Sequence, residues 1–287
     1  MFVQLYEEKF MRFPQGRSKA VTFSYDDGGE ADKRLVAVFD KYGLKGTFNL
    51  NTELFDAQCW HNRMNERDTF NLFCKSNHEI ANHGARHIFL DKVPLAEAVK
   101  EIVDCRAYLE GKFKRLVTGL AYSYSGYNEG VLSVLPSLGI DYARTTQSSY
   151  SFALPENWYL WNPTCKHSEK ELVRLADKFL NDSPEKAAKH RGPWLFYIWG
   201  HSFEFDESDD WNIIESLGER LCGRQDIWFA TNGEIYSYVK AYNSLVYSID
   251  GERVHNPSAL DVWVELRGKV YKIGAGKTVN FDKVKRF

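Results

Sequence analysis

The chain passes from an apolar run to two acids at Ala20-Val21-Thr22-Phe23-Ser24-Tyr25-Asp26-Asp27-Gly28. Residues 20–25 predict a buried β-strand, because they form a short, largely apolar run that is rich in β-branched and aromatic residues. Both carboxylates would then emerge at the C-terminal end of this strand. Two adjacent like charges beside a buried strand are costly unless a cation neutralises one of them.

A second motif lies some sixty residues further along, at His83-Gly84-Ala85-Arg86-His87. Two imidazoles four residues apart share one face if the segment forms a helical turn. One carboxylate and two imidazoles would supply three ligands to a zinc-type centre and leave a position open for water. The second carboxylate would be free to act as a base, which is typical of a hydrolase. The histidine pair alone also fits two polar loop residues, and it is the pair of acids that favours a metal site.

Strands and helices are expected to alternate along the rest of the chain up to residue 243. Strands are expected at 45–51, 78–82, 116–121, 140–144, 194–199 and 226–230, and helices at 30–42, 95–112, 128–138, 168–180, 211–222 and 233–242. About seven such β-then-α units favour a parallel α/β barrel. Functional residues of such barrels gather at the C-terminal ends of the strands. The residues expected at those ends are Asp26, Asp27, His83, Tyr124, Arg144 and His201.

The pattern changes after residue 243. Short apolar runs at 245–247, 260–266 and 270–273 predict small strands, and glycine-containing turns separate them. We therefore expect two units, a (β/α) barrel over residues 1–243 and a small β extension over residues 244–287.

Composition excludes several classes of protein. A net charge of −2 supplies no field that would attract nucleic acid. The longest apolar run, at residues 193–199, is too short to span a bilayer, so no membrane partner is expected. The five cysteines are scattered without a C-x-x-C pair, and the first twenty residues show no signal segment. We expect a cytoplasmic chain, although a secreted chain trimmed of its signal would look the same.

Taken together, the motifs resemble the polysaccharide deacetylases of carbohydrate esterase family 4, the NodB-homology group. Residues 22–28 resemble the T-F-D-D-G motif of that family, and residues 83–87 match its H-[ST]-x-x-H motif in spacing. Residues 43–48 resemble the strand that follows the first motif, and residues 199–201 resemble the late histidine motif. The resemblance implies a distorted (β/α)7 barrel. In this chain, the small C-terminal β appendage predicted above is expected to follow the barrel.

The resemblance also implies roles for individual residues. Asp26 corresponds to the catalytic base, and His201 corresponds to the general acid. Asp27, His83 and His87 correspond to the ligands of one divalent transition metal. Zinc is the expected metal, and cobalt, nickel or iron would fit the same ligands.

Ala121-Tyr122-Ser123-Tyr124 aligns with the R-x-P-Y motif of the family. Tyr124 therefore corresponds to the tyrosine whose backbone N–H helps to bind the oxyanion. The arginine and proline of the motif are missing, so the chain is similar to a divergent bacterial branch. Arg144, at the next strand end, is the expected catalytic replacement for the arginine, and Arg86 is the other candidate.

The activity that the resemblance implies is metal-dependent hydrolysis of N-acetyl or O-acetyl groups on a carbohydrate, with hydrolysis of C–N bonds other than peptide bonds in the N-acetyl case. An N-acetylated glycan is the expected partner, and association of the chain with itself is left open. Tyr122, Trp161 and Trp199 are expected to contact the glycan, because aromatic rings present apolar faces that suit sugar rings. Two alternatives remain: an amide or cyclic-ureide hydrolase acting on a small metabolite, and a carbohydrate-binding barrel without turnover.

Overall fold

The computed structural model describes residues 8–57, 61–186 and 192–282. The strands of the barrel are β2 (Lys19–Asp26), β3 (Gly46–Leu50), β4 (Glu79–Asn82), β5 (Gly119–Ala121), β6 (Tyr142–Arg144), β7 (Cys165–Lys166), β8 (Trp194–His201) and β9 (Ile227–Phe229). The α-helices are α1 (Asp32–Tyr42), α2 (Glu66–Phe73), α3 (Leu95–Phe113), α4 (Glu129–Val134), α5 (Glu171–Asn181), α6 (Phe203–Glu207), α7 (Asn212–Leu221) and α8 (Asn232–Asn243). Short 3-10 helices are η1 (Pro14–Gly16), η2 (Ser123–Ser125), η3 (Trp158–Leu160) and η4 (Pro184–Lys186).

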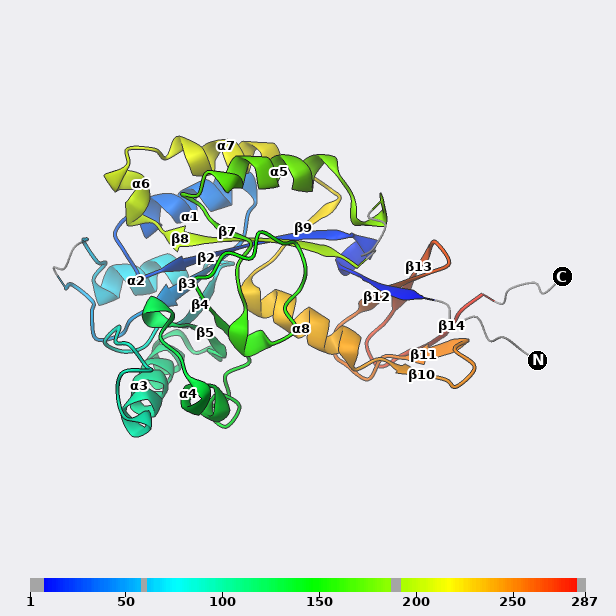
Figure 1. Ribbon diagram of the computed structural model, residues 1–287, viewed down its shortest axis with the longest axis horizontal. Helices are drawn as coiled ribbons and strands as arrows, with labels where there is room; N and C mark the ends of the chain where they lie inside the picture. The colour runs from blue at the N-terminus through cyan, green and yellow to red at the C-terminus, as the bar shows by residue number, and fades with distance from the viewer. Residues whose placement is uncertain (1–7, 58–60, 187–191, 283–287) are drawn as a thin grey trace.

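One parallel sheet forms the centre of the molecule, with the strand order β6-β5-β4-β3-β2-β8-β7. Strand β9 pairs with the first half of β2, outside this order. Helices α1, α5 and α7 cover one face of the sheet, and α8 crosses the other face (Figure 1). The sheet curls into a distorted α/β barrel, which confirms the predicted fold class. Within the described ranges, no helix combines the length and the apolar character that crossing a bilayer requires.

Alternation along β2 separates a core face from a polar face. Val21, Phe23 and Tyr25 are buried in the main apolar core, among side chains of α1, α5 and α7. Because successive strand residues point in opposite directions, Ser24 and Asp26 face the other side. Both of them accept a hydrogen bond from the Asn49 side chain of β3, at 2.8 Å in each case. The last residue of β2 therefore projects a carboxylate into the interior of the barrel.

The register of the parallel strands gathers the strand ends at one edge. Asp26 pairs with Asn49 of β3 on one side and with His201 of β8 on the other. In the same sheet, Leu50 at the end of β3 pairs with Asn82 at the end of β4. Side chains that follow these positions therefore meet at the C-terminal edge, as the barrel architecture requires.

Two small antiparallel sheets lie beside the barrel, in the orders β1-β12-β13 and β10-β11-β14 (Figure 1). Their strands are β1 (Lys9–Arg12), β10 (Val246–Tyr247), β11 (Arg253–His255), β12 (Val262–Leu266), β13 (Lys269–Ile273) and β14 (Thr278–Asn280). Strand β1 pairs with β12, so residues 9–12 lie in one sheet with strands from beyond residue 243. The division at residue 243 otherwise stays a prediction.

The hydroxyl of Tyr238 joins α8 to two neighbouring strands of the first small sheet, β1 and β12. It donates a hydrogen bond to the carbonyl of Arg12 at 2.5 Å and accepts one from the backbone N–H of Trp263 at 3.0 Å. We expect Tyr238→Phe to lower the free energy of unfolding by about 1–3 kcal/mol, because two backbone groups lose their partner. Urea unfolding followed by circular dichroism measures this change.

Tyr150→Phe is the matched control, since Tyr150 is exposed and lies outside the small sheets. It should change the free energy of unfolding by less than about 0.5 kcal/mol. Equal effects of the two substitutions would show that the Tyr238 hydroxyl does not connect these elements.

Candidate metal centre and active site

The three predicted metal ligands lie together at the C-terminal edge of the sheet. The ligand atoms of Asp27, His83 and His87 are all within 4.8 Å of one another. Asp27 Oδ1 lies 3.6 Å from His83 Nε2 and 3.4 Å from His87 Nε2. One carboxylate oxygen and two imidazole nitrogens therefore surround a common point.

A loop carries the two histidines, and not the helical turn that their spacing would also fit. Residues 83–89 follow β4 without regular secondary structure. The backbone is left-handed at Gly84 (φ 76°) and at His87 (φ 58°), which folds the loop back on itself. Asp27 is also left-handed, with a φ of 82°. Such a conformation costs energy in a residue other than glycine and is common at functional sites.

His83 is oriented to present a lone pair to this point. Its Nδ1 lies 2.8 Å from the carbonyl oxygen of Ala121, a bond that requires Nδ1 to carry the proton. Its Nε2 therefore carries the lone pair, and this atom is buried with no hydrogen-bond partner in the described part of the chain. Asp27 Oδ1 is likewise buried and accepts no hydrogen bond from the described residues, although it forms an ion pair with Arg63. This donor set fits a divalent transition metal, and a bond to the second imidazole nitrogen is typical of such ligands.

Asp26 has different surroundings from its neighbour. Its Oδ1 accepts a hydrogen bond from Asn49, and its Oδ2 is paired with the guanidinium of Arg144. His83 Nε2 lies 3.8 Å from the same Oδ2. Burial raises the pKa of Asp26, but the charges of Arg144, His83 and His201 outweigh it and lower the pKa to about 2. Asp26 is therefore an ionised carboxylate whose orientation is fixed.

Of the two arginines considered for Asp26, Arg144 makes the contact. Arg144 is fully buried, and its guanidinium lies 4.6 Å from the centre of the Trp199 ring. Arg86 instead pairs with Glu97 and Glu101 of α3. A neighbouring strand thus places a positive charge beside Asp26.

Asp27 also has an arginine partner, Arg63, which the sequence analysis missed. Its Nη2 lies 3.1 Å from Asp27 Oδ1, and its Nη1 donates to the carbonyl of Asp27 at 2.6 Å. Burial raises the pKa of Asp27, but His83, Arg63 and His87 outweigh it, so the pKa is lowered. Each of the two adjacent acids therefore has a guanidinium as its counter-cation. No local pattern distinguishes Arg63, which lies in an irregular loop between β3 and α2.

His201 faces the same point from the end of β8. Its Nε2 lies 3.9 Å from Asp27 Oδ2, and its Nδ1 lies 3.1 Å from Glu204 Oε1. Burial lowers the pKa of His201, but the hydrogen bond with Glu204 and the two aspartates outweigh it and raise the pKa. Lys166 donates to the same Glu204 oxygen at 2.5 Å. This network favours a protonated imidazole.

These side chains line one cavity of about 360 Å³. Its walls are formed by Asp26, Asp27, His83, His87, Tyr122, Tyr124, Thr146, Trp199, His201, Phe203 and Glu204. Tyr122 and Trp199 are thus on the wall, as a substrate contact requires. Trp161 is 1% exposed and packs against Tyr142 and Tyr197 away from this wall, so we leave it out of the proposed contacts.

Tyr124 lies at the rim of the cavity. It is 49% exposed, and its backbone is left-handed with a φ of 55°. Its ring packs edge-on against His87 at 4.4 Å between centroids and stacks on Phe89 at 4.1 Å. The sequence placed this tyrosine correctly at the end of β5, but it did not predict the stack.

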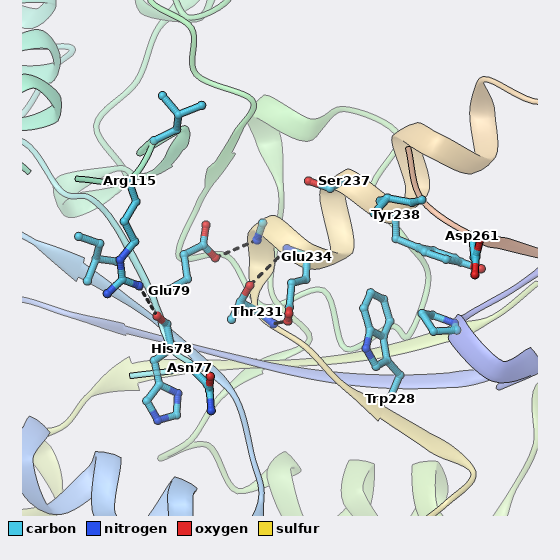
Figure 2. A pocket seen from close by; sticks show the side chains of 15 residues that line it. Asn77, His78, Glu79, Arg115, Trp228, Thr231, Glu234, Ser237, Tyr238 and Asp261 are labelled. Carbon is cyan, nitrogen blue, oxygen red and sulfur yellow. Dashed lines mark hydrogen bonds between the residues drawn. The ribbon is translucent and has the colours of Figure 1, made fainter. Parts of the chain in front are cut away.

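A larger cavity of about 500 Å³ lies elsewhere (Figure 2). His78 and Arg115 line one end of it, and Trp228 and Tyr238 line the other (Figure 2). His78 precedes β4, whereas His83 follows β4, so this cavity lies at the opposite edge of the sheet from the candidate metal centre. Arg115 donates to the His78 carbonyl.

Comparison with known proteins shows which proteins this chain is similar to. Residues 14–143 match the family model described as polysaccharide deacetylase. The matched part of the chain contains Asp26, Asp27, His83 and His87. A search of the curated proteins gave no match.

The first two of the following solved structures share the fold at low sequence identity. A candidate polysaccharide deacetylase from Mycobacterium smegmatis is 16% identical with a TM-score of 0.57, over 83% of this chain and 95% of that chain. The peptidoglycan deacetylase PdaC from Bacillus subtilis is 16% identical with a TM-score of 0.50, over 79% of this chain and 94% of that chain. The deacetylase PplD from Streptococcus pyogenes is 20% identical with a TM-score of 0.40, over 44% of this chain and 55% of that chain.

The metal content of two variants tests whether the metal ligands and Asp26 have separate roles. We expect His83→Ala to weaken Zn²⁺ binding by more than about 100-fold, because it removes a ligand and not merely a supporting group. Asp26→Asn should keep about one equivalent of metal, since Arg144 and Asn49 hold that side chain outside the ligand set. Elemental analysis of purified, dialysed protein measures both, and equal losses would contradict the division of roles.

Proposed function

We propose that this chain is a metal-dependent carbohydrate deacetylase that removes acetyl groups from an N-acetylated glycan. The observation that carries this proposal is the meeting of Asp26, the triad Asp27–His83–His87 and His201 on one cavity wall. The family match over residues 14–143 supports the same chemistry. We propose zinc as the metal, because two imidazoles and one carboxylate suit it.

Asp27, His83 and His87 would hold the metal. When bound there, a divalent metal supplies Lewis acidity, which polarises an acetamide carbonyl and makes a water molecule more acidic. Asp26 is ionised at neutral pH and lies beside this point, so it is the group that takes the proton of the attacking water. Arg144 and Asn49 fix its direction and prevent it from turning into the ligand set.

His201 is the proposed proton donor for the leaving nitrogen. An amide nitrogen leaves poorly as an anion, so its departure needs a proton from a positioned acid. Glu204 holds Nδ1 and thereby directs Nε2 toward the aspartates. The backbone N–H of Tyr124 is the proposed donor to the oxyanion, and such a donor contributes about 3 kcal/mol. Tyr122 and Trp199 are the proposed contacts to the sugar.

A carbohydrate-binding barrel without turnover is the second candidate. This candidate is supported by the ion pairs of Asp27 with Arg63 and of Asp26 with Arg144, because these pairs balance both negative charges without a metal ion. An amide or cyclic-ureide hydrolase has no comparable observation in its favour.

The test measures acetate released from a panel of N-acetylated oligosaccharides, with and without a chelator. We expect release that the chelator abolishes, that added Zn²⁺ restores, and that Asp26→Asn lowers by at least about 1,000-fold because the base is lost. Binding without release would favour the second candidate. Release that resists complete removal of metal would contradict the proposal.

Glu204 sets the alkaline limit of activity in this proposal. His201 must be protonated, so activity is lost as the pH rises through its raised pKa. Glu204→Gln removes the charge that raises this pKa, so the alkaline limb should move about one unit to lower pH. A pH profile of kcat/KM measures the shift. The neighbouring Glu207→Gln is the control, because Glu207 is exposed on α6, and an equal shift there would contradict the assignment.

A further inference from the structure

Arg63 is among the most deeply placed charges of the molecule. The side chains of Arg63 and Asp27 are 2% and 1% exposed, and the ion pair joins Nη2 to Oδ1 at 3.1 Å. The other terminal nitrogen, Nη1, donates to the Asp27 carbonyl and to Asn51 Oδ1 at 2.8 Å. The guanidinium therefore contacts one residue at both its backbone and its side chain.

The oxygen that Arg63 approaches is the one proposed to bind the metal. Asp27 Oδ1 faces His83 Nε2 at 3.6 Å and His87 Nε2 at 3.4 Å. An ionised carboxylate oxygen has two lone-pair directions, so it can meet a guanidinium and a metal ion together. Its charge is then shared between two cations, and the two cations repel each other.

The charges of the two aspartates are already balanced without an ion. Asp26 and Asp27 contribute two negative charges, and Arg144 and Arg63 contribute two positive charges within contact distance. A divalent ion would therefore give the buried cluster a net positive charge, with a guanidinium next to the ligating oxygen.

We propose that Arg63 is a built-in counter-cation of Asp27, which stabilises the metal-free site and lowers its affinity for a divalent metal. This inference rests on the metal site of the proposed deacetylase. It makes Arg63 a positioning residue that acts on the metal through Asp27 and does not touch the reacting atoms.

A purely orienting role for Arg63 predicts the opposite sign. Groups that orient a metal ligand usually strengthen binding, and their loss weakens it by 10–100-fold. Here the backbone is held independently, because Asp27 N–H donates to the Asn49 carbonyl at 3.0 Å and Met64 N–H donates to the Gly28 carbonyl at 3.0 Å. Loss of the Arg63 charge should therefore outweigh loss of orientation.

The test titrates chelator-stripped full-length protein with Zn²⁺ against a chromophoric chelator of known affinity. We expect Arg63→Met and Arg63→Gln to bind Zn²⁺ at least about tenfold more tightly than the wild type, because a like charge beside the ligand is removed. The matched control is Arg115→Met, since Arg115 donates to the backbone carbonyls of Phe73 and His78 at the opposite edge of the sheet. It should leave the Zn²⁺ affinity unchanged.

Thermal unfolding supplies a second readout on the same proteins. Without metal, Arg63→Met should have a lower Tm than the wild type, and saturating Zn²⁺ should raise its Tm by more than it raises that of the wild type. Arg63→Gln retains one donor for the Asp27 carbonyl and serves if the methionine variant does not fold.

Each result of the titration decides one question. Tighter Zn²⁺ binding in the neutral variants, including binding that the wild type lacks, supports the counter-cation. Equal or weaker binding than the wild type overturns it and leaves the proposed deacetylase intact. Zn²⁺ binding by neither the wild type nor any variant overturns both the counter-cation and the metal-dependent function.

Discussion

Two carboxylates buried side by side at the end of β2 govern the construction of this site. Burying a carboxylate without a partner is strongly unfavourable, and burying two in adjacent positions adds their mutual repulsion. Each carboxylate forms an ion pair with an arginine from a separate part of the chain. Arg144 of β6 pairs with Asp26, and Arg63 of the loop before α2 pairs with Asp27. The two buried carboxylates therefore gain their counter-charges only once the barrel has assembled.

Strand register explains how one short edge collects so many groups. Asn49 and His201 flank Asp26 because β3 and β8 pair with β2 in register, and the loop after β4 then carries His83 into the same space. Left-handed backbone at Asp27 and His87 aims side chains that a regular strand or helix would direct elsewhere. The rigid sheet thus fixes positions, and a few strained residues fix directions.

The sequence was sufficient for the parts that depend on periodicity and on strand ends. It predicted the alternating barrel, and it placed Asp26, Asp27, His83 and His201 at strand ends where the structure has them. It could not predict β7 or α6, because segments of two and five residues are too short for a periodic signal. The contact of Arg63 with Asp27 could not be predicted either, because the path of an irregular loop brings the two residues together. The pairing of β1 with β12 depends on contacts between distant segments, which local patterns do not record.

That pairing also constrains how the protein is made. Lys9 of β1 lies opposite Leu266 of β12, so β1 can pair with its neighbour only after the barrel between the two strands has been synthesised. Contacts so distant in sequence form late and slow the overall search. During synthesis, β1 would remain without a paired neighbour while the barrel strands emerge from the ribosome. An unpaired strand edge can associate with other chains. The pairing that closes this sheet can therefore form only after the barrel strands between β1 and β12 have been synthesised.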